Sequence, residues 1–119
     1  MFGIALNNKS PIHEQLTNRI TELVLSGVLE PDSALPSVRE LAADLGINPN
    51  TVQRAYGELE RRGVTYSVTG KGRFVTGNVN KVKEEKKLEA IERLKAEIEN
   101  ALSEGVTCDE IRKMLEEDI

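Results

Sequence analysis

Apolar residues recur every three or four positions in the first half of the chain, the spacing that gathers side chains on one face of an α-helix. The first such segment opens at Ser10 and Pro11, where serine favours the N-cap and proline the first helical position. The second opens at Ser37, which with Glu40 three residues later has the capping-box pattern, and it stops at Gly46. The two predicted apolar stripes are Ile12, Leu16, Ile20, Leu23 and Val24, then Val38, Leu41, Ala42 and Leu45.

A third apolar stripe follows after a turn of about four residues that contains a glycine. Asn48 is a typical N-cap and Pro49 a typical first helical residue, and this helix is expected to run to Gly63. Its inward positions are Val52, Ala55, Tyr56 and Leu59. Two helices joined by a short glycine turn form a helix-turn-helix, and the caps, the turn and both stripes agree on it.

Two β-prone runs come next, residues 64–68 and 73–75, with a glycine-rich turn at residues 69–72. A hairpin of two strands is unstable alone, so it must lean on the helices. Three helices and a hairpin predict a winged helix-turn-helix. The Gly-x-Gly of the turn does not lead from a strand into a helix, which argues against a phosphate-binding loop. Residues 2–6 alternate weakly and predict a short additional strand.

The rest of the chain predicts a hinge at residues 77–80 and two further helices within residues 81–119. Gly105 separates these helices, and Thr107 with Glu110 forms a second capping-box pattern. Two helices cannot enclose a core by themselves, so their apolar stripe needs a partner, most simply a second copy of the chain. The residues expected at this dimer interface are Leu88, Ile91, Leu94, Ile98, Leu102, Ile111, Met114 and Leu115. The predicted fold is α+β and mainly helical, with a winged helix-turn-helix domain (1–76) and a two-helix dimerisation segment.

Composition narrows the function classes further. With four aromatic residues among 119, the core must be aliphatic. Apolar runs are far shorter than the ~20 residues of a membrane span, and the N-terminus lacks the features of a signal peptide, so we expect no membrane partner and a cytoplasmic protein. The single cysteine, Cys108, excludes an intrachain disulfide and a cysteine-rich zinc site.

Charge is unevenly distributed along the chain. The formal net charge is −4, yet cations and anions balance over residues 1–76, so the excess acid lies in the C-terminal segment. Residues 49–76 carry a local charge of about +3, which suits a nucleic-acid partner better than the chain average suggests.

The sequence of residues 10–76 closely resembles the DNA-binding domain of the GntR family of bacterial transcription regulators. Four stretches carry the resemblance, and the second and third are the most specific: PIHEQL from Pro11, LPSVRELA from Leu35, GINPNTVQRAY from Gly46 and GKGRFV from Gly70. The short two-helix segment resembles the YtrA-type subfamily. The resemblance implies a dimeric, repressor-like regulator, often of transport operons, that reads a palindromic operator.

In a helix-turn-helix, the N-terminal residues of the second helix meet base edges in the major groove. Here they are polar and lie opposite the apolar stripe: Asn48, Asn50, Thr51, Gln53 and Arg54. Asparagine and glutamine pair with adenine, and arginine with guanine or phosphate. The resemblance adds Ser37 and Arg39 at the start of the preceding helix. The tip of the wing completes the predicted interface with Thr69, Gly70 and Lys71, where glycine permits close approach and lysine meets phosphate.

Each of these residues also has a purely structural interpretation. Asn48 could serve only as a cap, Arg54 as a solvated charge, and Arg39 as a partner in a surface salt bridge. His13 has no second histidine or cysteine near it in the sequence, which speaks against a metal site. Cys108 opens a helix and could act as a redox sensor, although a simple helix-start residue is the plainer interpretation.

Two other classes of function compete with DNA binding. A winged helix can act only as a protein-interaction module, but such a surface would carry apolar anchors where residues 48–54 are polar. An enzyme would need a nucleophile–base constellation, which one histidine and one cysteine do not supply, so we expect no catalysis, cofactor or metal. A two-helix segment leaves little room for a large ligand cavity, so a small-molecule effector would need a small pocket at the dimer interface.

Overall fold

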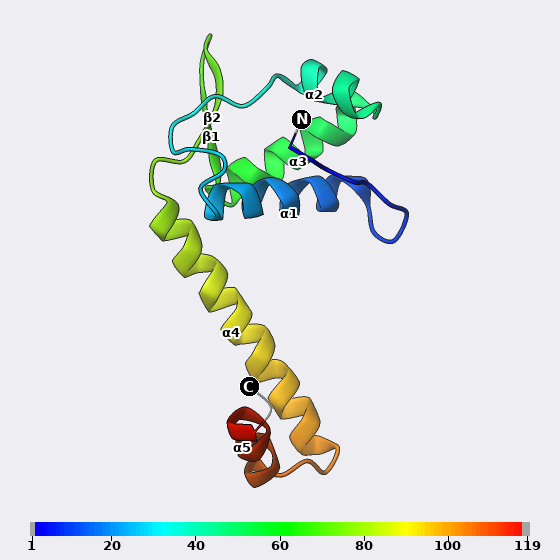
Figure 1. Cartoon of the computed structure of the whole chain (residues 1–119), viewed down its shortest axis with the longest axis vertical. Coiled ribbons are helices and arrows are strands. Elements are labelled where there is room, and N and C mark those ends of the chain that lie inside the picture. The colour runs from blue at the N-terminus through cyan, green and yellow to red at the C-terminus, as the bar shows by residue number, and fades with distance from the viewer. Residues whose placement is uncertain (1, 118–119) are drawn as a thin grey trace. The chain divides into compact units, whose positions relative to one another are not determined.

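A computed structural model describes residues 2–117 of the chain. The elements follow in the order α1 (Ile12–Leu25), α2 (Val38–Leu45), α3 (Pro49–Arg61), β1 (Thr65–Val68), β2 (Gly72–Val75), α4 (Val79–Ser103) and α5 (Cys108–Glu117) (Figure 1). They form two units, a head unit that runs to Lys83 and a tail unit that starts at Glu84. The predicted α+β, mainly helical class is confirmed.

The head unit encloses an aliphatic core between its three helices and the hairpin. α3 packs against both α1 and α2, and the side chains that meet there are fully buried. The cluster includes Leu16 and Ile20 from α1, Leu41 from α2, and Val52 and Leu59 from α3. These are positions that the three apolar stripes predicted, so periodicity located the helical part of the core of the head.

The turn between α2 and α3 is fixed by local hydrogen bonds. The capping box at the start of α2 is present: the backbone N–H of Glu40 donates to the Ser37 hydroxyl, and Glu40 accepts from the Ser37 N–H. Gly46 ends α2 at φ +67°, a left-handed conformation that favours glycine. The backbone N–H of Ile47 then donates to Ala42. Since these bonds set the direction of the chain, they determine how α3 is presented.

The wing is an antiparallel hairpin whose register pairs Thr65 with Val75 and Val68 with Gly72. Gly72 therefore belongs to β2, and the turn is shorter than the predicted 69–72. The loop before α2 runs along the other edge of β2, since Leu35 donates to the Arg73 carbonyl at 2.8 Å. These contacts hold the hairpin against the head, as the instability of an isolated hairpin requires.

Three further sequence predictions about element boundaries are wrong. Residues 2–6 form no strand; Phe2 takes a positive φ, and the segment lacks a partner strand. Ser10 is not the N-cap of α1, because Pro11 is extended, at ψ 137°, and its carbonyl accepts the first helical bonds. The Gln15 side chain holds the preceding segment by donating to the Ser10 carbonyl. The third correction concerns the hinge.

The predicted hinge at 77–80 is already partly helical, because α4 begins at Val79. Val82 in its first turns is buried in the core of the head. The head unit therefore extends to Lys83 rather than to residue 76. The outermost ends of the two predicted domains, Met1 and residues 118–119, lie outside the described residues.

The tail unit consists of α5 and the larger part of α4. α5 opens on the predicted capping box, in which the Glu110 N–H donates to the Thr107 hydroxyl at 3.2 Å. The two helices border a largely apolar groove of about 310 Å³, lined by Leu94, Ile98, Ala101, Val106, Ile111, Met114 and Leu115 together with one charged residue, Glu97. Within residues 2–117 we find no helix that combines the length and apolarity of a membrane span.

Candidate nucleic-acid interface

The first turn of α3 presents a polar surface. Asn48 caps the helix, with its side-chain oxygen 2.8 Å from the Asn50 N–H, and Pro49 holds the first helical position. Asn50, Gln53 and Arg54 are exposed, whereas Val52 between them is fully buried. The cap uses only the side-chain oxygen of Asn48, so its amide N–H groups can still donate to a base. Thr51 is half-buried at the edge of this surface.

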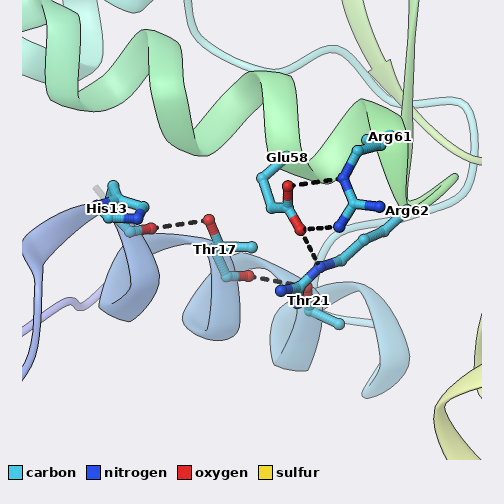
Figure 2. A network of polar contacts seen from close by, with 6 residues as sticks. All are labelled: His13, Thr17, Thr21, Glu58, Arg61 and Arg62. Carbon is cyan, nitrogen blue, oxygen red and sulfur yellow. Dashed lines mark hydrogen bonds and ion pairs between the residues drawn. The ribbon is translucent and has the colours of Figure 1, made fainter. Parts of the chain in front are cut away.

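Two of the cations in the +3 segment are held within the protein. Arg61 and Arg62 both donate to Glu58, the Nε of Arg62 lying 2.8 Å from its Oε1 (Figure 2). Hydrogen bonds from Arg61, then from Arg62, lower the pKa of Glu58 to about 2, so this carboxylate stays charged. These two arginines are therefore partly neutralised and less available to an outside anion.

The other cations of the predicted interface have no such partner. Within residues 2–117, Arg39, Arg54 and Lys71 form neither a hydrogen bond nor an ion pair through their side chains, and all three are exposed. The salt bridge considered for Arg39 is absent from this part of the chain. Unpaired guanidinium and ammonium groups on one domain are ready to meet phosphate or base acceptors.

A groove of about 370 Å³ brings together predicted residues that lie far apart in the sequence. Its lining includes Ser37 at the N-terminus of α2, Gln53 from α3 and Lys71 from the wing. Tyr56 lies in its wall, and its hydroxyl donates to the Pro36 carbonyl at 2.8 Å. Burial raises the pKa of Tyr56, so the phenol remains a donor. Three elements thus contribute to one concave surface that mixes polar and apolar side chains.

The tip of the wing is exposed, as predicted. Gly70 has φ +76°, and a side chain there would meet nothing within 4 Å, so backbone conformation alone requires glycine within the protein. Thr69 and Lys71 flank it, and the Lys71 N–H closes the turn on the Val68 carbonyl. The tip therefore presents backbone and one cation without bulky side chains.

A second polar depression lies on the opposite side of α3. It measures about 400 Å³ and is lined by His13, Glu14, Thr17 and Asn18 of α1 and by Arg54, Glu58 and Arg62 of α3. Figure 2 shows the inner network of this region, in which the Thr17 hydroxyl donates to the His13 carbonyl. Arg54 therefore lies between this depression and the exposed end of α3.

Sequence reasoning left one cation out of the predicted site. Arg73 lines the same groove as Lys71, and its guanidinium carbon lies 5.2 Å from the centre of the Tyr56 ring. The Gly-Lys-Gly-Arg run offered the signal, but its place over Tyr56 depends on packing between β2 and α3.

The other candidates find no chemical partners. Cys108 is a free, exposed cysteine, and among residues 2–117 no group of three histidine, cysteine or carboxylate side chains is arranged to hold a metal.

The predicted dimer residues lie on the tail unit, where Leu88, Ile91, Leu94, Leu102, Met114 and Leu115 are exposed. Ile98 and Ile111 are half-buried beside the apolar groove.

The head unit contains a helix-turn-helix, formed by α2 and α3, followed by a β-hairpin wing with a lysine at its tip. This arrangement is that of the winged helix-turn-helix class of proteins. Residues 12–75 match the model of the family described as "Bacterial regulatory proteins, gntR family". The chain belongs to this family.

Its relatives place the resemblance on the whole chain rather than the head alone. It is 38% identical to the HTH-type transcriptional repressor YtrA of Bacillus subtilis (strain 168), over 98% of this chain and 91% of that protein. A crystal structure of a transcriptional regulator from Oenococcus oeni superposes with a TM-score of 0.79 and 38% identity, covering 96% of this chain and 95% of the other.

A third relative includes DNA. The DNA-binding domain of AraR in complex with operator ORE1 matches with a TM-score of 0.54 and 31% identity, over 60% of this chain and 90% of that one.

Proposed function

We propose that the chain is a sequence-specific DNA-binding transcription regulator, a repressor that binds a palindromic operator as a homodimer. The observation that carries this proposal is the polar first turn of α3, where Asn50, Gln53 and Arg54 are exposed above a fully packed core. Family membership and the AraR–operator relative support it, and the full-length relative YtrA is named a repressor. Because the known relatives are regulators, the proposal includes no catalysis.

The proposed mode of binding places the start of α3 in the major groove. Asn50 and Gln53 can each form bidentate hydrogen bonds with adenine, and Arg54 can do so with guanine. Arg39 at the start of α2 and Lys71 at the wing lie on either side of α3 in the chain and add contacts to the backbone or the minor groove. The protein-interaction alternative would need apolar anchors on this surface, and these positions hold none.

The proposed dimer is formed by the tail unit. Six apolar side chains of α4 and α5 are exposed in the single chain, and the groove beside them is apolar. Covering this surface with the same surface of a second copy would remove it from water, which is the main favourable term in association. Two heads held at a fixed spacing then read two half-sites of one palindrome.

A gel-shift experiment with the DNA upstream of the gene for this chain tests the proposal. We expect retardation of that fragment at protein concentrations that leave a scrambled duplex of the same length free. Footprinting should then reveal a two-fold symmetric site. Equal affinity for the upstream and scrambled duplexes would contradict a sequence-specific regulator and favour the interaction module.

The proposal also covers the location of the protein, the genes that it regulates and a small-molecule effector. A regulator of transcription acts where the bacterial chromosome is, so the proposal includes a cytoplasmic location. Control of a transport operon stays a prediction from the family resemblance, and the footprinted promoter tests it. A small-molecule effector, if one binds, is expected to be apolar, because the groove between α4 and α5 has an almost wholly apolar lining.

A further inference from the structure

Arg73 lines the groove of about 370 Å³ described above. Its guanidinium is held against Tyr56 but has no hydrogen-bond or ion-pair partner within residues 2–117. Arg73 is half-buried, and its Nη1 atom is fully covered without a hydrogen-bond partner. The guanidinium lies over the face of the Tyr56 ring, 5.2 Å from the ring centre. A guanidinium carries five N–H donors, so most of its bonding capacity is unused.

The surroundings of Arg73 favour an anion. Lys71 lines the same groove and is unpaired, and the first turn of α2 borders it at Ser37 and Val38. The N-terminus of a helix carries a partial positive charge and unpaired N–H groups. One carboxylate, Glu40, also lines the groove, and it accepts a hydrogen bond from the Ser37 N–H in the capping box. Two cations and a helix N-terminus, against this one hydrogen-bonded carboxylate, therefore lie on one concave surface.

Tyr56 holds the guanidinium in place for such a ligand. Its hydroxyl is fixed on the Pro36 carbonyl at 2.8 Å, and its ring lies under Arg73. Stacking on an aromatic ring restricts the long arginine side chain before any ligand arrives, so less conformational entropy is lost on binding. Arginine in this setting suits the planar, bidentate recognition of phosphate oxygens.

We propose that Arg73 and Lys71, with the N-terminus of α2, bind a phosphate group in this groove, and that it is a backbone phosphate of the bound DNA. The inference rests on the proposed function, since it assigns a phosphate contact to the strand that passes between α3 and the wing. It adds Arg73 to the DNA-binding residues and gives the groove a role that base readout does not supply.

Binding of the full chain to the upstream fragment and to a scrambled duplex, measured over a range of salt concentrations, tests the assignment. Arg73→Gln should weaken both complexes alike, by about tenfold per protomer, because a phosphate contact carries no base information. It should also lower the slope of log K against log salt by about 1 per protomer. Arg93→Gln, which makes the same change of charge in the tail, is the matched control and should alter neither.

Two further measurements separate a phosphate contact from a structural role of Arg73. In ethylation interference on the upstream fragment, one phosphate per half-site should lose its effect in Arg73→Gln and keep it in Arg93→Gln. Lys71→Gln should weaken binding in the same direction without changing the melting temperature, since the Lys71 side chain is exposed and forms no hydrogen bond or ion pair within residues 2–117. If Arg73→Gln and Lys71→Gln both match Arg93→Gln in affinity and salt slope, the inference is wrong.

The source of the phosphate is tested with inorganic phosphate. Titration of the ¹⁵N-labelled chain with millimolar phosphate should leave the Arg73 side-chain resonance nearly unchanged, whereas the upstream duplex should shift it. A shift by inorganic phosphate together with unchanged DNA affinity of Arg73→Gln would mean a free-anion site and overturn the assignment to DNA. If the wild-type chain binds neither duplex, the proposed function fails. If it binds and Arg54→Ala weakens it while Arg73→Gln does not, this inference alone fails.

Discussion

The head and tail units use the same kind of side chain in opposite ways. In the head, Leu16, Ile20 and Leu41 are 0% exposed, because three helices and a hairpin surround them. In the tail, Leu94 and Leu115 are each 59% exposed, since two helices offer only one layer of cover. The apolar core of the head is enclosed within a single chain, whereas the tail exposes apolar side chains to solvent.

From this difference we expect the two units to have different functions, DNA recognition by the head and self-association by the tail. Polar side chains on the surface of the head, such as Gln53 and Arg54, are exposed, and we propose that they recognise DNA. Apolar side chains that leave the tail are expected to recognise another copy of it. Four sets of substitutions test this division, in order of decreasing effect.

A charge in the tail should have the largest effect. Ile98→Asp places a carboxylate beside the apolar groove, where the dimer would bury it without a partner at a cost of several kcal/mol, so association should weaken by more than about 100-fold. Sedimentation should show a monomer, and binding to the two half-sites of the operator should fall with it. The circular dichroism of the head should persist.

Asn100→Asp is the matched control, because it adds the same charge on the exposed side of α4. It should remain dimeric and bind as the wild type does. A dimeric Ile98→Asp would move the interface elsewhere, and a monomer with full operator affinity would mean that dimerisation does not position the heads.

The second largest effect is expected from truncation of a leucine, which should change the stability of the head and the dimer affinity of the tail. Leu41→Ala leaves a cavity in a closed core and should destabilise the head by ~2–5 kcal/mol, which is about 10 °C or more in melting temperature. Leu94→Ala removes an exposed side chain, so it should leave the melting temperature of the monomer nearly unchanged and raise the dissociation constant of the dimer. Thermal melts and sedimentation over a range of concentrations measure the two effects. Equal losses of monomer stability would contradict the division.

How much of this could be seen in the sequence depends on the range of the signal. The capping boxes, the turn at Gly46 and the apolar stripes were predicted correctly because each is set by neighbours a few residues away. The strand expected at residues 2–6 was wrong because alternation does not supply a partner strand. The start of α4 was missed because the burial of Val82 depends on the core of the head.

The candidate site follows the same rule. The polar first turn of α3 was predicted from its place after a cap, and the structure finds Asn50 and Arg54 exposed there. Which cations are unpaired could not be read from a charge count, since Glu58 ties up Arg61 and Arg62 through side-chain geometry. The position of Arg73 over the Tyr56 ring could not be predicted, because this contact joins β2 to α3. The roles of these residues in DNA binding remain predictions.

Removal of single cations on the head should have a moderate effect on DNA binding and none on folding. Arg54→Ala should cost ~1–3 kcal/mol of operator affinity, and discrimination at one base pair should relax if Arg54 reads a base. Arg39→Ala should weaken binding as well, because its side chain pairs with no carboxylate within residues 2–117. Fluorescence anisotropy with the operator and with single-base variants gives both quantities. Unchanged affinity in both variants would remove the proposed recognition surface.

The smallest effect is expected from pH and the Glu58 network. The pKa of Glu58 is lowered from 4.5 to about 2 by hydrogen bonds from Arg61 and Arg62. A carboxyl group whose pKa is lower in the folded state stabilises the fold above its unfolded pKa, and this contribution is lost as the pH falls from about 4.5 toward 2.

The melting temperature of the wild type should therefore exceed that of Glu58→Gln by a small margin at neutral pH, because exposed ion pairs contribute little. The margin should shrink as the pH falls from about 4.5 and vanish only below pH 2, where the carboxyl is protonated in both the folded and the unfolded state. Glu92→Gln in the tail, which removes a weaker pair with Lys95 at 3.6 Å, should change the profile less. A margin that stays constant down to pH 2 would mean that the Glu58 carboxylate does not contribute through its charge.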